Sequence, residues 1–259
     1  MILHGSVMKF RTNICLLEDD TDMYNRIAIF GLTGDPFTIA HRDICKQAIN
    51  TLNIDKLYVI PTIVDYHRKG KDKWLTDPQK LHCMKQMLFS MGIGYYERCV
   101  IDTYELRLKN LFSTYDTLYS EFIEKRRFIH TLLEFKARHY EPSQEVLLII
   151  GTDELRIFQS WYMWDLVLEN ISSLVVVNGR DGEEVEIPVP IMENMQGQVV
   201  SMPLSKSYLY NVSASAVRHW YRNDKLEDYL DDVRKIDSYE MDWITVPWIA
   251  KKKEIQENG

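Results

Sequence analysis

Two polar residues at the start of a predicted helix are the first candidates for chemistry. Thr38 and His41 follow the short apolar run 27–30, with glycines and a proline in the connection 31–36. The apolar run is typical of a buried strand, and the glycines and the proline permit a tight turn after it. Thr38 is a favourable N-cap residue, so His41 is expected in the first helical turn, where backbone N–H groups and the helix dipole favour anions. The pattern therefore predicts a phosphate-binding site.

Composition and charge favour a small anionic ligand over a nucleic acid. The 259 residues are 46% hydrophobic and carry a net charge of −7, and the pI is near 5.6. This length and composition are enough for one large core. The acidic balance lacks the electrostatic footprint of nucleic-acid binders, so no nucleic acid is expected as a partner.

Cysteine and histidine spacing indicates a reduced chain without a metal centre of its own. The four cysteines form no CxxC pair, and no secretory segment precedes them. The histidines have no metal-ligand spacing with cysteines or acids. No apolar run approaches the roughly 20 residues of a membrane span. We therefore expect a cytoplasmic protein that does not enter a membrane.

Strands and helices alternate along the chain. Apolar runs predict strands at 27–30, 56–61, 99–102, 145–150, 173–177 and 199–202. Helical spacing predicts helices at 39–49, 78–91, 117–140, 158–168 and 211–218, whereas 179–197 reads as an acidic loop. This alternation predicts a doubly wound α/β fold with a parallel sheet and helical additions. We divide the chain into an N-terminal extension (1–25), the α/β domain (26–222) and a C-terminal helical tail (223–259).

The connection after the first strand excludes two common phosphate motifs. It lacks the third glycine of the dinucleotide fingerprint, and no Gly-Lys-Ser/Thr follows it. Gly31-Leu32-Thr33-Gly34-Asp35-Pro36-Phe37-Thr38-Ile39-Ala40-His41 resembles instead the Gly-x-Thr-Phe-Asp-Pro-x-His/Thr-x-Gly-His signature of the nucleotidyltransferase superfamily. Val212-Ser213-Ala214-Ser215-Ala216-Val217-Arg218 resembles the second signature, Ile-Ser-Ser-Thr-x-x-Arg, and lies where that signature is expected. The resemblance implies a Rossmann-like nucleotidyltransferase fold.

Three further blocks narrow the resemblance to nicotinate (or nicotinamide) mononucleotide adenylyltransferases. Gly151-Thr152-Asp153, followed by Phe158, Trp161 and Trp164, is similar to that family's Gly-x-Asp…Phe…Trp block. Asp102 and Glu105 resemble its acidic strand end, and Thr114-Tyr115-Asp116-Thr117-Leu118 resembles its Ser-Tyr-Thr-x-x-Thr-Leu segment. The matching blocks span roughly residues 26 to 220.

The first signature departs from the family pattern at three positions. Gly34 replaces its Phe, Ala40 its last Gly and Thr38 its first His. The threonine variant is that of the related phosphopantetheine adenylyltransferases. The helical stretch 119–140 and the tail after Arg222 are longer than is usual in the bacterial enzymes.

The resemblance implies transfer of AMP from ATP to a pyridine mononucleotide, with Mg2+ on the phosphates. The acceptor phosphate is already a nucleophile, so the enzyme needs positioning and charge stabilisation. The resemblance implies catalytic roles for His41, Thr38 and Arg218. The candidates for ATP binding are Gly31, Leu32, Thr33, Asp35, Gly151, Asp153, Ser213 and Ser215. The acceptor is expected at Thr114, at Trp161, which would stack on the pyridine ring, and at Lys69, with Arg68 of the same loop as the alternative source of positive charge. Self-association is left open.

Two alternatives follow from the departures. Thr38 also fits another adenylyl- or cytidylyltransferase of the superfamily with a phosphopantetheine-type acceptor, although the aromatic block at 153–164 argues against it. Gly34 and Ala40 also fit a catalytically weak nucleotide-binding regulator.

Overall fold

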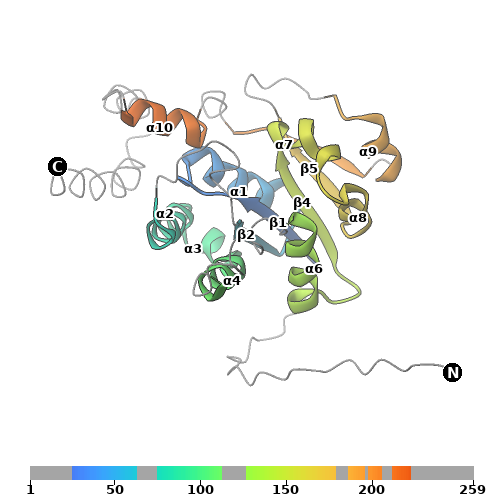
Figure 1. Ribbon diagram of the computed structural model, residues 1–259, viewed down its shortest axis with the longest axis horizontal. Coiled ribbons are helices and arrows are strands. Elements are labelled where there is room, and N and C mark those ends of the chain that lie inside the picture. Colours follow the sequence, from blue (N-terminus) through green and yellow to red (C-terminus); the bar gives the residue numbers. More distant parts are fainter. Residues whose placement is uncertain are drawn as a thin grey trace.

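Six strands form one parallel sheet at the centre of the protein. The structure is a computed structural model, and it describes residues 25–62, 75–112, 127–178, 186–195, 198–205 and 212–222. The strands are β1 (Arg26–Leu32), β2 (Lys56–Pro61), β3 (Cys99–Ile101), β4 (Glu145–Gly151), β5 (Ser173–Val177) and β6 (Val199–Met202). Their order is β3-β2-β1-β4-β5-β6, and every neighbouring pair is parallel (Figure 1). The strand order reverses between β1 and β4, and ligands of open α/β sheets bind at such a switch point.

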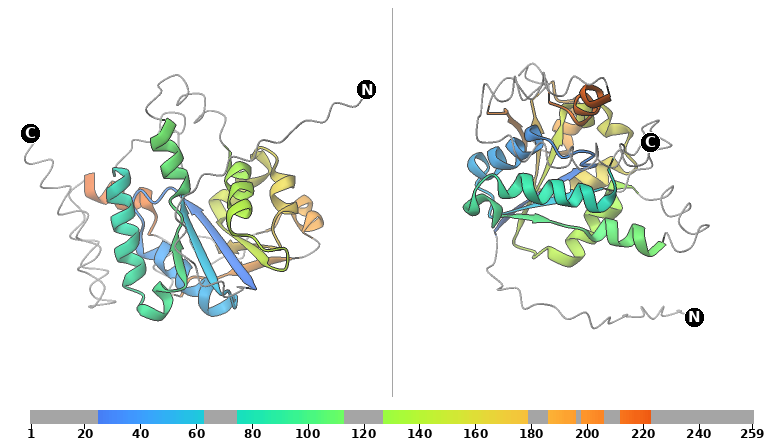
Figure 2. Two further views of the ribbon diagram at one scale, coloured as in Figure 1. Left: turned by 90° about the horizontal axis from the view of Figure 1, so that it is seen from below. Right: turned by 90° about the vertical axis from the view of Figure 1, so that its left-hand side faces the viewer.

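Helices cover both faces of this sheet. The helices are α1 (Ile39–Thr51), α2 (Asp77–Phe89), α3 (Ile93–Tyr96), α4 (Tyr104–Phe112), α6 (Phe128–His139), α7 (Thr152–Ile157), α8 (Trp164–Glu169), α9 (Val189–Asn194) and α10 (Ala214–Arg222). One core cluster packs α1, α2 and α10 on alternate side chains of the strands. The second cluster packs α6, α7, α8 and α9 on the opposite side chains. Figure 2 shows the sheet surrounded by these helices in two further views. The predicted doubly wound fold is confirmed.

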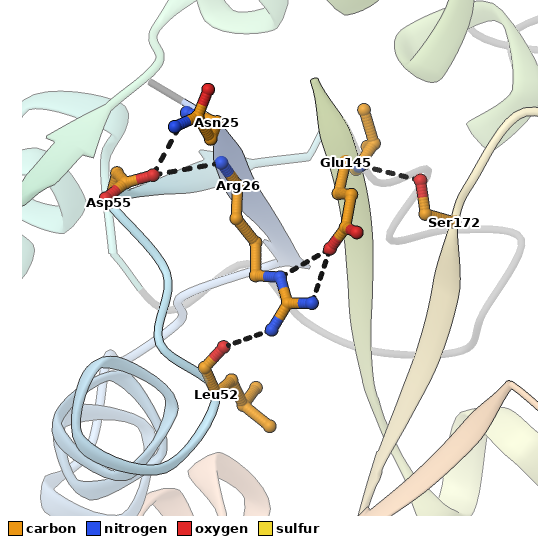
Figure 3. A network of polar contacts seen from close by, with 7 residues as sticks. Asn25, Arg26, Leu52, Asp55, Glu145 and Ser172 are labelled. Atoms are coloured by element: carbon orange, nitrogen blue, oxygen red, sulfur yellow. Dashed lines mark hydrogen bonds and ion pairs between the residues drawn. The ribbon is translucent and has the colours of Figure 1, made fainter. Parts of the chain in front are cut away.

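The amino-terminal edge of the sheet is held by a small polar network around β1 (Figure 3). Asp55 accepts hydrogen bonds from the backbone N–H groups of Asn25 and Arg26, both at 3.0 Å. The Arg26 guanidinium donates to Leu52 O at 3.0 Å and pairs with Glu145 at 2.5 Å. Since the Arg26–Glu145 pair is solvent-exposed, its contribution to stability is small, and the backbone contacts are what fix the start of β1.

All six predicted strands are confirmed, but the predicted helix at 158–168 is wrong. The chain instead forms α7, a 3-10 turn (Phe158–Ser160) and α8 as separate pieces. Trp161 is extended, and Met163 takes the left-handed conformation at φ +54. Phe158 and the apolar residues of α8 pack on the same core cluster, so their spacing in the sequence resembles that of one helix. No glycine or proline marks the break.

The prediction of a loop over 179–197 was wrong in part, and one helix was not predicted. The structure shows α4, which the sequence did not predict, and α9 inside the stretch read as a loop. Pro190 lies in the first turn of α9, a position that suits proline because the N–H it lacks has no helical acceptor. The predicted helix at 117–140 is described only as α6, which begins at Phe128. The extension 1–24, the basic loop at 65–73 and the tail 223–259 lie outside the described residues.

Candidate active site

The first signature forms the turn between β1 and α1, at the switch point of the sheet. Gly34 in this turn has φ +57, a left-handed conformation that favours glycine. A Cβ at Gly34 would also lie 2.0 Å from Cε of Met84. Met84 is fully buried on α2 and fills the space beside this backbone. This geometry explains why glycine stands where the family signature has a phenylalanine.

Thr38 and His41 form a reciprocal capping box at the start of α1. The backbone N–H of His41 donates to the Thr38 hydroxyl at 3.4 Å, and Nδ1 of His41 accepts from the backbone N–H of Thr38 at 2.9 Å. An imidazole nitrogen that accepts a hydrogen bond carries no proton, so the proton of the neutral ring is on Nε2. The box therefore presents His41 as an Nε2–H donor.

The ring of His41 stays neutral at physiological pH. Burial lowers the pKa of His41 to about 4, because desolvation disfavours the charged imidazolium. The rings of Phe30 and Phe37 lie 6.1 and 5.3 Å from it and supply the apolar surroundings. A neutral imidazole beside a helix N-terminus can still donate its Nε2–H to a phosphate oxygen.

Asp35 organises the turn through its buried carboxylate. The side chain is 1% exposed, and its Oδ1 accepts the backbone N–H of Leu75 at 2.7 Å. The carbonyl oxygen of Asp35 accepts a hydrogen bond from the guanidinium of Arg218 on α10. Asp35 thus joins the first signature both to the chain entering α2 and to the second signature.

The second signature is held against the first by contacts between their helix starts. The Thr38 hydroxyl donates to Val212 O at 3.3 Å, and Arg218 Nη2 donates to the Ser215 hydroxyl at 3.0 Å. In Figure 1, α10 lies beside α1 accordingly. Ser213 directly precedes α10, so the predicted phosphate-binding side chains of both signatures lie at neighbouring helix starts.

A buried acid on α1 fixes the chain that leads to the second signature. Asp43 is 7% exposed and lies one helical turn below the site. Its carboxylate accepts the backbone N–H of Ser205 at 2.7 Å and contacts the Ser205 hydroxyl at 2.5 Å. Sequence reasoning missed Asp43, because its partner follows β6 and is remote in the chain.

An aromatic cluster lies beside the carboxyl end of β1. The ring centroid of Trp161 is 4.8 Å from that of the buried Phe158 and 5.2 Å from that of Phe128. Phe128 is the first residue of α6, and its Cε2 lies 3.1 Å from where a Cβ at Gly31 would be. Sequence reasoning missed Phe128. The available signal was 128–132, Phe-Ile-His-Thr-Leu, which repeats the spacing of Thr-x-x-Thr-Leu with phenylalanine in the first place.

The remaining candidates are placed as follows. Gly151 ends β4, and among the described residues no atom beyond its chain neighbours lies within 4 Å of a Cβ built on it. Asp153 is exposed in the first turn of α7, and its carboxylate lies 3.5 Å from Arg156. Leu32 is the last residue of β1 and Thr33 follows it, and both are half-buried. The predicted residues Lys69 and Thr114 lie outside the described ranges.

The two acids near the end of β3 are buried and contact α6. Burial disfavours the charge of Asp102, but hydrogen bonds from His139, Arg138 and the Tyr104 backbone outweigh this effect and hold its pKa below the usual value. The Arg138–Asp102 distance is 2.8 Å. Glu105 is also buried and accepts a hydrogen bond from Thr131. Both acids therefore tie α4 and the strand end to α6.

Within the described ranges, no three His, Cys, Asp or Glu side chains form a group that could hold a metal ion. None of the helices in that part of the chain is long and apolar enough to cross a membrane.

Comparison with known proteins agrees with this geometry. A family model described as cytidylyltransferase-like matches residues 29–219, and the chain belongs to this family. The probable nicotinate-nucleotide adenylyltransferase of Hydrogenovibrio crunogenus is 27% identical over 214 residues, 79% of this chain and 90% of that protein. The protein of the same description from Campylobacter fetus is 31% identical, over 71% of this chain and 85% of its own length. The chain is therefore a nucleotidyltransferase, similar to nicotinate-nucleotide adenylyltransferases.

A solved structure is also similar to the chain. Plasmodium falciparum nicotinic acid mononucleotide adenylyltransferase complexed with NaAD matches with a TM-score of 0.49 and 18% identity. The match covers 81% of this chain and 96% of that chain.

Proposed function

We propose that the protein transfers AMP from ATP to nicotinate mononucleotide, or to its amide, with release of pyrophosphate, as a step of NAD biosynthesis. The observation that carries this proposal is the junction of the two signatures. Thr38 contacts Val212 and Arg218 contacts Asp35, so two phosphate-binding helix starts lie next to each other. The names of the relatives support the pyridine acceptor.

The reaction needs positioning more than covalent chemistry. An oxygen of the acceptor phosphate attacks the α-phosphorus of ATP while the bond to the pyrophosphate oxygen breaks, and negative charge spreads over the oxygens. The Nε2–H of His41 donates to an α-phosphate oxygen as this charge develops. Arg218, Ser213 and Ser215 hold the leaving β- and γ-phosphates at the start of α10.

In this scheme the Thr38 hydroxyl donates to different acceptors before and after ATP binds. It caps α1 and donates to Val212 O at 3.3 Å, which couples the two signatures. Donation to the α-phosphate then exchanges this long hydrogen bond for a stronger one to a charged oxygen. The carboxylate of Asp153, just after the end of β4, accepts a hydrogen bond from a ribose hydroxyl.

Mg2+ is expected on the phosphates of ATP. The described residues offer no cluster of acidic ligands, and this donor set fits an ion held by the triphosphate and by water, as Mg2+ is in many nucleotide enzymes. The ion would neutralise phosphate charge there.

The test is turnover with defined acceptors. Purified protein is incubated with ATP, Mg2+ and either nicotinate mononucleotide, nicotinamide mononucleotide or phosphopantetheine, and pyrophosphate and the dinucleotide product are measured. We expect product with a pyridine mononucleotide. ATP binding without pyrophosphate release from any acceptor would overturn the proposal, and turnover with phosphopantetheine alone would reassign the acceptor.

A His41→Ala variant removes the donor, and His41→Gln is the control for the capping box. Glutamine keeps the box, because Gln79 forms the same box with Thr76 at the start of α2. Loss of one correctly placed donor typically lowers kcat by about 10²- to 10³-fold. We expect such a loss in His41→Ala and a smaller one in His41→Gln, because the glutamine amide can also donate. Full turnover in a folded His41→Ala protein would refute the assigned role of His41.

A further inference from the structure

The ring of Phe128 covers the tryptophan assigned to the acceptor. The ring centroids of Phe128 and Trp161 are 5.2 Å apart and tilted by 54°. A flat ring inserted between two others needs about 3.5 Å on each side, or roughly 7 Å in total. No pyridine ring fits between the two as they stand. A ligand that stacks on this side of Trp161 must therefore move an aromatic ring.

Phe128 is the ring that can move. Phe158, the other neighbour of Trp161, is 0% exposed in the core, whereas Phe128 is partly exposed at the first position of α6. Ile129 and Leu132, both buried, anchor that helix independently of Phe128. Rotation of the Phe128 side chain therefore leaves α6 in place.

We propose that Phe128 determines the affinity for the acceptor by occupying the stacking position of the acceptor ring on Trp161. Binding then exchanges the phenyl ring for the six-membered ring of the acceptor, which is planar and similar in size. This inference rests on the proposed function, since it assumes a pyridine mononucleotide as the acceptor. The exchange selects against acceptors without an aromatic ring, because they displace Phe128 without replacing its contacts.

The contact with Gly31 places this exchange next to the reaction centre. Phe128 Cε2 lies 3.1 Å from a Cβ position at Gly31, so any side chain there would press against the ring. Gly31 precedes the turn that carries Thr38 and His41. When Phe128 moves away, the space beside Gly31 opens, at the end of the strand that leads into this turn.

The test is the affinity of a Phe128→Ala variant for the mononucleotide. The acceptor can stack on Trp161 only in molecules in which the Phe128 ring has moved away. The apparent affinity for the acceptor is therefore proportional to the fraction of these open molecules. An aromatic pair contributes enough beyond its buried area to change this fraction by about two- to tenfold. We expect the Kd of the mononucleotide, measured by calorimetry without ATP, to fall by this factor, with the KM for ATP unchanged.

Two further variants make the result specific. Phe128→Leu keeps an apolar side chain without an aromatic face, and we expect it to lie between wild type and Phe128→Ala. Phe89→Ala is the matched control, because Phe89 is 52% exposed on α2 and also pairs with an aromatic ring, that of Tyr96. We expect no change of either constant in this control.

The outcomes distinguish a failure of the role of Phe128 from a failure of the proposed pyridine acceptor. An equal or weaker affinity in a folded Phe128→Ala protein, with the mononucleotide bound by wild type, overturns the role of Phe128 alone. Failure of both proteins to bind either mononucleotide overturns the pyridine acceptor, and the inference with it.

Discussion

The neutral state of His41 predicts a specific pH dependence of stability. Burial lowers the pKa of His41 from 6.5 to about 4 in the folded protein. Between these values the unfolded chain binds a proton that the folded protein does not, so the free energy of unfolding decreases as pH falls through this window. The perturbation is His41→Gln, which removes the titrating ring and keeps the capping box.

The magnitude follows from these two pKa values. At pH 5 the unfolded histidine is almost fully protonated, and a folded pKa of about 4 leaves the native ring mostly neutral. The linkage then costs the wild type about 2 kcal/mol relative to pH 8. His41 as a whole residue is partly exposed, and solvent screening reduces this value, so we expect an effect of about 1 to 2 kcal/mol.

The assay is urea unfolding of wild type and His41→Gln at pH 8 and at pH 5. The change in capping strength is the same at both pH values, and the other titrating groups are the same in both proteins. Both effects therefore cancel when the pH-dependent loss of stability of the variant is subtracted from that of the wild type. We expect the wild type to lose about 1 to 2 kcal/mol more than the variant. If the free energies of unfolding of wild type and His41→Gln differ by the same amount at both pH values, the conclusion that the buried ring is neutral is refuted.

Two further predictions concern packing at the site and beneath it. Gly34→Ala should lower the free energy of unfolding by about 1 to 3 kcal/mol, because its Cβ meets Met84 and its φ is positive. In a Met84→Ala background the same change should cost less, and a double-mutant cycle with no coupling would contradict the contact. Asp102→Asn should cost about 1 to 3 kcal/mol at pH 7, since it weakens the hydrogen bonds with Arg138 and His139. This cost should shrink as pH falls below 3.8, because Asp102 of the unfolded chain then binds a proton while the folded carboxylate, whose pKa is held lower, keeps its charge; chemical unfolding at pH 7 and 3 measures both.

Local signals in the chain were sufficient for the strands and for the cap of the first site helix. Apolar runs located every strand, and Thr38 marked the start of α1 because an N-cap is defined by the few residues after it. The breaks around Trp161 were not predictable. Met163 takes a left-handed conformation that its residue type does not predict. The separate segments also pack apolar residues on one core cluster, so their spacing in the sequence resembles that of a continuous helix.

The sequence by itself determined the class of fold, because strands and helices show in the periodicity of short segments. It also contains both signatures, and their resemblance to a known family implies the phosphate-contacting residues of the proposed mechanism. Only the tertiary structure decided what lies next to them. Arg218 reaches Asp35 and Thr38 reaches Val212 across more than 170 residues, because the strand order and crossovers bring these ends together. The same folding brings Phe128 against both Gly31 and Trp161, which are remote from it in the sequence.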